Sequence, residues 1–144
     1  MNGDVTFVLG SRVKMLGYNI ERLALRHYAG RFFASMVSVI IDLPVYDTQC
    51  GAKIFRNNLE FQKAFSHPFT VNWSFDVELI GRLKIIKKAL DLKPLEESAI
   101  EYPLGRWFHH CGSKIKAIDL LIAMKELLSL KKAFRSSSYV SKFI

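Results

Sequence analysis

Two periods of hydrophobic and polar residues alternate along this chain. Short apolar runs rich in β-branched and aromatic residues, each bounded by turn residues, predict buried strands. Longer segments in which apolar residues recur every three or four positions predict helices. Strands that alternate with helices indicate an α/β fold. The predicted strands cover residues 4–9, 51–55 and 99–104, and the predicted helices cover residues 19–41, 57–65, 74–88 and 113–134.

Local signals mark the ends of these elements. Pro44 ends the first long helix, because proline cannot supply the next backbone donor. An asparagine is expected to cap the short helix at 57–65. Asp76 and Glu78 fall in the first turn of the next helix, where negative charge suits the helix dipole.

The length and composition fit one globular domain. A chain of 144 residues buries roughly two thirds of its unfolded surface when it folds. Half of the residues are apolar and 24% are charged, which is typical of globular rather than disordered chains. The serine-rich segment 136–144 is predicted to be a disordered tail, so the predicted domain covers residues 1–135.

The charge balance favours anionic partners. There are 21 Lys and Arg against 13 Asp and Glu, a net charge of +8, which suits phosphates, acidic lipid or nucleic acid. Nucleic acid is the weakest of these, since no motif for it is present and the cations are scattered. The start of the sequence has no signal-peptide pattern, and the near-apolar stretch 32–41 is too short to span a bilayer. Cys50 and Cys111 lack metal-ligand spacing, so we expect reduced thiols in a cytoplasmic protein.

Two arginines occupy positions from which they reach a common cleft. Arg12 follows the first strand and a Gly-Ser turn, where side chains extend beyond the carboxyl end of a strand. Arg26 lies on the following helix. Two converging guanidinium groups suit a phosphate monoester, each charge-assisted contact contributing roughly 1.5–3 kcal/mol. The alternative is that both arginines are ordinary solvated charges.

The loop that begins at Asp47 is a second candidate site. The run Asp-Thr-Gln-Cys-Gly-Ala-Lys-Ile-Phe at 47–55 connects the first long helix to the second predicted strand. Asp47 is placed to act as a general base or to orient a neighbouring cation. Gly51 suggests a close backbone approach or a positive φ. The alternative for Asp47 is an Asx turn, in which its side chain bonds its own backbone.

Two acidic residues and two histidines do not predict a metal site. Asp76 and Glu78 are two positions apart on a helix, so their side chains point about 200° away from each other and cannot chelate one ion. His109 and His110 are adjacent, and consecutive side chains diverge in strands and helices alike. A histidine of this loop could still lie near a bound acceptor.

The last predicted helix has two interpretations. Its lysines lie near its ends, and a basic helix of this kind can lie on an anionic membrane, gaining about 1 kcal/mol per cation. It can equally cover the core with its lysines solvated. The predicted apolar arc consists of Ile115, Ile118, Leu121, Ile122 and Leu128.

Six motifs in a fixed order resemble the C-terminal half of family 2 glycosyltransferases with a GT-A fold. The likeness covers residues 4–134 and is greatest to the polyprenyl- and dolichyl-phosphate glucosyltransferase branch. The motifs are Gly-Ser-Arg at 10–12, the helical Arg26, the run at 47–55, Trp-Ser-Phe-Asp-Val-Glu-Leu at 73–79, Glu-Tyr-Pro-Leu-Gly-Arg-Trp at 101–107 and Gly-Ser-Lys at 112–114.

The resemblance implies transfer of a sugar from a nucleotide-sugar to a lipid phosphate with inversion. Arg12 and Arg26 would then bind the lipid phosphate, and Asp47 would lie at the reaction centre as a base or an electrostatic organiser. A phosphate acceptor is already a nucleophile at neutral pH, so positioning and charge compensation would dominate. Also assigned to the acceptor side are Gln49, Lys53, Trp73, Asp76, Glu78, Arg106, Trp107, Ser113 and Lys114.

The chain departs from this family in two ways. Ala52 stands where relatives usually carry an aromatic residue, which predicts looser local packing. The family's first half supplies the nucleotide-binding units and an Asp-x-Asp motif that holds Mg or Mn, and no Asp-x-Asp occurs here. We therefore expect the chain alone to bind no metal, to engage a nucleotide-sugar only with the missing half, and to be inactive.

A half-domain also implies partners. It would expose a sheet edge and an apolar face, and so would dock on a separate N-terminal half or associate with itself. The alternative function is a non-catalytic protein that binds lipid phosphate or a membrane surface. In that case the chain would be peripheral at the membrane.

Overall fold

The computed structural model describes residues 5–21, 24–108 and 117–144, with the backbone alone described at residues 24–27 and 117. Strands and helices alternate along it, so the predicted α/β class with a mixed sheet and flanking helices is confirmed. The elements are β1 (Phe7–Ser11), β2 (Asn19–Ile20), α1 (Ala24–Ile41), β3 (Lys53–Phe55), α2 (Leu59–Ala64), α3 (Phe75–Ala89), α4 (Leu95–Ser98), β4 (Ala99–Pro103), β5 (Arg106–Trp107), α5 (Ala117–Ala133) and α6 (Ser137–Val140).

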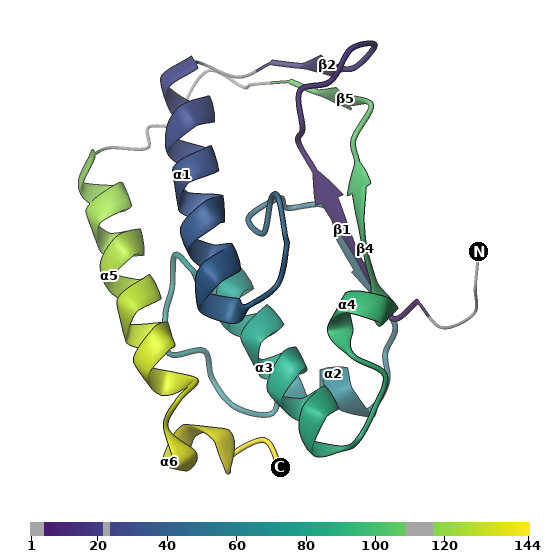
Figure 1. The fold of residues 1–144 in the computed structure, drawn as a ribbon, viewed down its shortest axis with the longest axis vertical. Coiled ribbons are helices and arrows are strands. Elements are labelled where there is room, and N and C mark those ends of the chain that lie inside the picture. The colour runs from purple at the N-terminus through teal and green to yellow at the C-terminus, as the bar shows by residue number, and fades with distance from the viewer. Residues whose placement is uncertain (1–4, 22–23, 109–116) are drawn as a thin grey trace.

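A three-stranded sheet of order β3-β1-β4 forms the centre of the molecule. Strand β1 is antiparallel to β3 and parallel to β4, with Val8 opposite Ile54 on one side and Ile100 on the other. A parallel two-stranded ladder, β2-β5, extends the same end of the molecule at which β1 finishes (Figure 1). The carboxyl end of β1 therefore lies beside the segment that joins β4 to β5.

The helices lie against one face of the central sheet. In Figure 1, α1, α3 and α5 stand on the same side of β1 and β4, and α1 packs against both α3 and α5. Most side chains of α3 are buried, which makes it the helix at the middle of this layer. Burial of apolar surface between the sheet and these helices supplies the main stabilisation. The core includes Phe7, Leu9, Val37, Ile41, Phe61, Val77, Ile80, Leu83, Ile86, Leu127 and Leu130.

The cap of α2 and a glycine on α3 show how individual residues fit this packing. The side chain of Asn58 accepts a hydrogen bond from the amide of Phe61 at 3.2 Å, so the predicted asparagine cap is confirmed. Gly81 lies under the ring of Phe134, whose nearest carbon would be 2.2 Å from a Cβ at this position. A larger residue at 81 would push α5 away from α3.

The first long helix is shorter than the sequence predicted. It was expected to begin at residue 19, but Asn19 and Ile20 form β2 and α1 begins at Ala24. The two residues pair with Arg106 and Trp107, far along the chain. Helical periodicity cannot reveal such a pairing, because the competing partner lies outside any local window.

Helix α5 turns a different face to the core from the one its sequence pattern suggested. Its buried residues are Ala123, Leu127 and Leu130, while Ile118 and Leu121 of the predicted arc are exposed, as are Ile122 and Leu128. The helix is apolar on both sides, so periodicity alone could not choose between them. No helix in the described ranges is long and apolar enough to cross a membrane.

The expectation of a disordered tail over residues 136–144 is wrong. This segment contains α6, and the side chains of Tyr139 and Phe143 are buried in the main core. Tyr139 also packs edge-on to Phe134, with ring centroids 5.9 Å apart. Two aromatic residues and a buried hydrogen-bond partner outweigh the serine content on which the expectation rested.

Candidate functional site

Arg12 and Asp47 form a bidentate ion pair at the carboxyl end of β1. The guanidinium Nε donates to Asp47 Oδ2 at 2.6 Å and Nη2 donates to Oδ1 at 2.7 Å. The backbone amide of Arg12 also donates to Oδ2, at 3.1 Å. Burial lowers the pKa of Arg12, but the hydrogen bond and charge of Asp47 outweigh it, so the pKa lies above its usual value. This fixes the guanidinium in one orientation.

A close backbone contact places the Asp47 loop on β1. The amide of Gly10 donates to the carbonyl of Ala52 at 2.7 Å, and a Cβ on Gly10 would lie 2.9 Å from that of Ala52. The residue that requires a close approach is therefore Gly10. The prediction for Gly51 is wrong, because nothing lies within 4 Å of a Cβ built there and its φ is not positive. The expectation of looser packing at Ala52 stays a prediction, since the side chain of Ala52 is exposed and only its carbonyl bonds to β1.

The backbone of the Asp47 loop is held by a third element, β4. Glu101 accepts the amide of Tyr46 at 2.8 Å through Oε2 and the amide of Asp47 at 2.7 Å through Oε1. The loop then closes with a turn in which the amide of Cys50 donates to the carbonyl of Asp47 at 3.3 Å. The carboxylate of Asp47 accepts from the amide and the guanidinium of Arg12, whereas the Asx-turn alternative predicted a bond to its own backbone.

A second ion pair lies near the first. Lys53 Nζ is 3.0 Å from Asp76 Oδ1 and also donates to the carbonyl of Cys50. Burial raises the pKa of Asp76, and the hydrogen bond and charge of Lys53 offset only part of this effect. Asp47 and Arg12 also influence the charge of Asp76, which places the two pairs within electrostatic reach of each other.

Aromatic residues border the two ion pairs. The guanidinium of Arg12 lies 5.3 Å from the ring centroid of Trp107, a cation–π distance. Gln49 donates to the carbonyl of Trp73 at 3.4 Å, and the indole of Trp73 is exposed. Arg106 is exposed on β5, beside Trp107. The structure thus gathers Arg12, Asp47, Lys53, Asp76 and Trp107, with Gln49, Trp73 and Arg106 at the border.

Glu78 lies in the core, apart from this group. Its carboxylate is fully buried and is 2.6 Å from Arg82 Nη2. It also accepts the hydroxyl of Tyr139 at 2.7 Å and the amide of Thr70 at 2.8 Å. Burial raises the pKa of Glu78, but these donors outweigh burial and hold it below its usual value. Asp76 and Glu78 therefore bind different partners on opposite sides of α3.

Several predicted site residues lie outside the described part of the chain. Arg26 belongs to α1, but its side chain is not described. Ser113 and Lys114, together with the neighbouring His109 and His110, fall within residues 109–116. The predicted meeting of Arg12 and Arg26 at one phosphate stays a prediction.

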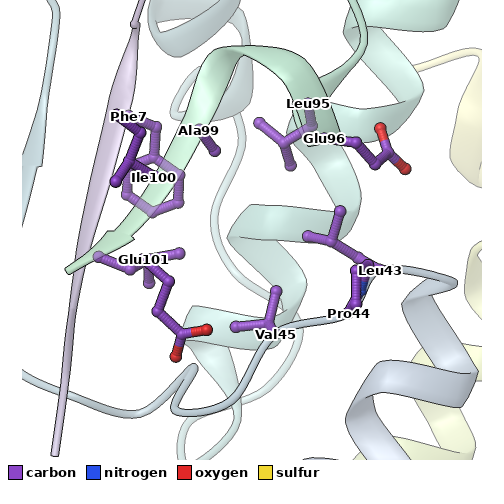
Figure 2. A pocket seen from close by; sticks show the side chains of 10 residues that line it. Phe7, Leu43, Pro44, Val45, Leu95, Glu96, Ala99, Ile100 and Glu101 are labelled. Carbon is purple, nitrogen blue, oxygen red and sulfur yellow. The ribbon is translucent and has the colours of Figure 1, made fainter. Parts of the chain in front are cut away.

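Two hollows adjoin the Glu101 clamp, by which we mean the two hydrogen bonds that the Glu101 carboxylate accepts from the amides of Tyr46 and Asp47. The smaller, about 100 Å³, lies between β4, α4 and the segment 43–45, with Glu101 at one end (Figure 2). It is below the size of ordinary ligand pockets, which begin at about 300 Å³. The larger, about 470 Å³, runs along α1 and is lined by Arg31, Tyr46 and Glu101 among others. Only the second has room for a substrate-sized group.

The carboxylates of this site do not suit a divalent metal ion. Asp47 and Asp76 each bind a cation of the protein, Arg12 and Lys53 respectively. Among the described residues no three His, Cys, Asp or Glu side chains come together in a way that could hold an ion. Mg and Mn prefer several oxygen ligands in a defined geometry, and the residues described here do not offer them.

Sequence reasoning missed two parts of the site. Glu101 was noted within a motif but not as a site residue, and its role depends on a partner 54 positions away. Arg31 stacks on the ring of Tyr46, with 3.7 Å between the guanidinium carbon and the ring centroid. No sequence signal marks this contact. A glutamate on the inner side of a predicted strand would have been a signal for Glu101, because buried carboxylates need donors.

One curated protein is similar to this chain over almost its whole length. The chain is 30% identical over 134 residues to dolichyl-phosphate beta-glucosyltransferase from Saccharomyces cerevisiae. The match covers 91% of this chain and 37% of the yeast protein. No protein-family model matches the chain, and no solved structure matches it.

Proposed function

We propose that this chain is the acceptor-side part of a family 2 glycosyltransferase of GT-A fold. The complete enzyme would transfer a sugar from a nucleotide-sugar to a polyprenyl phosphate, with inversion at the anomeric carbon. Support comes from the similarity to the yeast glucosyltransferase, which extends over 91% of this chain. It comes also from the geometry, since residues 12, 47, 53 and 76, which belong to three separate motifs, meet in one cluster.

The Arg12–Asp47 pair carries the proposal. Nε and Nη2 of Arg12 donate to Asp47, and Nη1 makes no hydrogen bond within the described part of the chain. A guanidinium held on one side and free on the other presents its remaining donors in a fixed direction. In this role Asp47 orients Arg12 toward the acceptor phosphate instead of removing a proton. A phosphate monoester needs no base at neutral pH, so positioning is the contribution that the reaction requires.

The test measures the affinity of the chain for citronellyl phosphate, a water-soluble acceptor analogue, by calorimetry or NMR titration. Arg12→Ala should weaken binding about ten- to a hundredfold, since a charge-assisted contact contributes roughly 1.5–3 kcal/mol. Arg135→Ala is the matched control, because Arg135 is an exposed arginine just after α5. Equal affinities for both variants would contradict the assignment of Arg12.

The chain alone is proposed to be inactive in transfer. It spans 37% of the yeast relative, and its sequence contains no Asp-x-Asp. Incubation of the purified chain with UDP-glucose and a polyprenyl phosphate should give no lipid-linked sugar. Turnover by the chain alone would contradict this.

A non-catalytic lipid-phosphate or membrane-surface binder is the second candidate. It is favoured by the exposed apolar side chains of Ile118, Leu121 and Leu128 on α5, with Lys125 exposed beside them. Such a protein would bind vesicles that contain anionic lipid, with an Arg12-dependent preference for phosphate. It would give no turnover even with the remaining part of a transferase supplied. That combination separates the two candidates and would place the protein peripherally on the membrane.

A further inference from the structure

The central sheet exposes apolar side chains on the face that the helices leave open. Phe7 points into the core, so by alternation Val8 points to the opposite face. The register places Ile54 and Ile100 on either side of Val8. Ile54 is 73% exposed, Ile100 is 38% exposed and Tyr102, two positions along β4, is 62% exposed. We call these four residues, Val8, Ile54, Ile100 and Tyr102, the outer sheet face.

Apolar side chains are unusual on a sheet face that is exposed to solvent. Sheets with one solvated face are normally antiparallel and carry polar residues there, whereas parallel pairs such as β1 and β4 are normally covered on both faces. In Figure 1 no helix of the described chain lies over this face. A hollow of about 270 Å³ at its β3 side, lined in part by Val8, Ile54 and Phe55, offers a seat for further apolar side chains.

The edge next to this face is open to pairing. The amide of Gly10 donates to Ala52 and that of Arg56 to Thr6. Alternate residues of an antiparallel strand point their backbone groups in opposite directions, so Lys53 and Phe55 direct theirs away from β1. In the described part of the chain, β3 has no second strand partner.

The opposite edge, β4, is protected. The amide of Leu104 donates to the carbonyl of Ser11, so the backbone of Pro103, one position earlier, faces outward. Proline has no amide to donate, and it is one of the residues that block strand addition at an edge. The two edges are therefore not equivalent, and strand addition is favoured at β3.

We propose that the outer sheet face and the β3 edge together bind a polypeptide equivalent to the unmatched part of the yeast relative. That polypeptide would add a strand to β3 and cover the outer sheet face with apolar side chains. The proposal rests on the proposed function, because the match leaves almost two thirds of the yeast protein without a counterpart in this chain. The occupant is thus a chain that completes the sheet.

The test uses the intact 144-residue chain, co-expressed with a tagged polypeptide comprising the unmatched part of the yeast protein. We expect the two to co-purify as a 1:1 complex, in which the amides of Lys53 and Phe55 exchange with solvent at least tenfold more slowly than in the free chain. Ile54→Lys should weaken the complex at least tenfold. Val39→Lys should leave it unchanged, since Val39 is an equally exposed branched residue on α1.

Each contrary outcome has a defined meaning. Unchanged exchange at Lys53 and Phe55 together with full affinity of the Ile54→Lys variant would overturn the proposed surface. A dimer of the chain alone that Ile54→Lys converts to monomer would overturn the proposed occupant in favour of a second copy. Failure of the proposed function is distinguishable, because it would appear as loss of Arg12-dependent phosphate binding in a complex that still forms.

Discussion

The Glu78–Arg82 pair and the Asp47–Arg12 pair have the same chemistry and the same shortest distance, 2.6 Å. Their surroundings differ. Arg82 is fully buried and also donates to the carbonyls of Ala64, His67 and Pro68, so its donors are used within the core. Arg12 has a side chain that is 20% exposed and one nitrogen without a partner among the described residues. The donors of Arg82 are all used within the fold, whereas Arg12 keeps a donor for the ligand proposed above.

The largest expected effect comes from breaking the saturated pair. Arg82→Met leaves Glu78 buried without its cation, which should lower the free energy of unfolding by about 3–5 kcal/mol. Urea unfolding followed by circular dichroism measures it.

Arg12→Met provides the comparison for that variant. Asp47 keeps the amide of Arg12 as a donor, so the expected cost is about 1.5 kcal/mol. If the two variants lost the same free energy, the distinction between the pairs would fail.

Tyr139 sharpens the comparison, because its hydroxyl belongs to the saturated pair. Tyr139→Phe removes its hydrogen bond to Glu78, which should cost about 1.5–3 kcal/mol. Burial and the bond to Glu78 raise the pKa of Tyr139 to about 12 from its ordinary value of 10.0. The folded state therefore holds this proton more tightly, and the contribution is complete below pH 10.0 and lost as the pH rises toward about 12.

Thermal melts across this alkaline range should show the loss in the parent chain. The difference between the parent and the Tyr139→Phe variant should shrink as the pH rises. A constant difference would mean that the hydroxyl proton is held no more tightly in the folded state.

The Asp47 loop should be more sensitive to backbone fit than to charge. Gly10→Ala places a Cβ 2.9 Å from that of Ala52, and overpacking of this kind costs about 1–3 kcal/mol. Gly51→Ala is the matched control in the same loop, with nothing within 4 Å, and it should be neutral or stabilising by about 0.4–1 kcal/mol. Chemical denaturation measures the free energy of unfolding of both variants and so tests this difference. A destabilising Gly51→Ala would show that the loop is constrained in another way.

The smallest expected effect concerns Asp76 and has the opposite sign to that of Glu78. The lowered pKa of Glu78 gives stability that is present above its ordinary value of 4.5 and is lost as the pH falls through its folded value. Burial raises the pKa of Asp76, so its contribution instead grows as the pH falls toward its ordinary value of 3.8. In Asp76→Asn this gain should disappear, while stability at neutral pH changes by less than about 1 kcal/mol. Urea unfolding at several pH values would contradict the sign if the variant gained more than the parent on acidification.

The sequence predicted elements where the signal was local. Strands and helices with a clear period appear close to their expected positions, including the strand at 99–104 and the helix at 74–88. The segments that were missed depend on distant partners. Strand β2 exists because of β5, and α6 is ordered because Tyr139 reaches Glu78, 61 positions away.

The candidate site followed the same rule. Motif order identified Arg12 and Asp47, but not that they bind each other across 35 positions. The place of Glu78 could have been anticipated, because Arg82 follows four residues later on the same helix face, the spacing of an intrahelical ion pair. For Glu101 the sequence signals only that a glutamate on the inner side of a strand needs donors; it does not identify them, since its partners are amides rather than side chains.

The Glu101 clamp has a consequence for how the protein is made. Asp47 leaves the ribosome 54 residues before the carboxylate that holds its amide. Until β4 has been synthesised and has paired with β1, the amides of Tyr46 and Asp47 lack the carboxylate that holds them. The geometry of the Asp47 loop is therefore completed late in synthesis, together with the closure of the sheet. A nascent chain that stops short of β4 would carry every residue of the Asp47 loop and none of its shape.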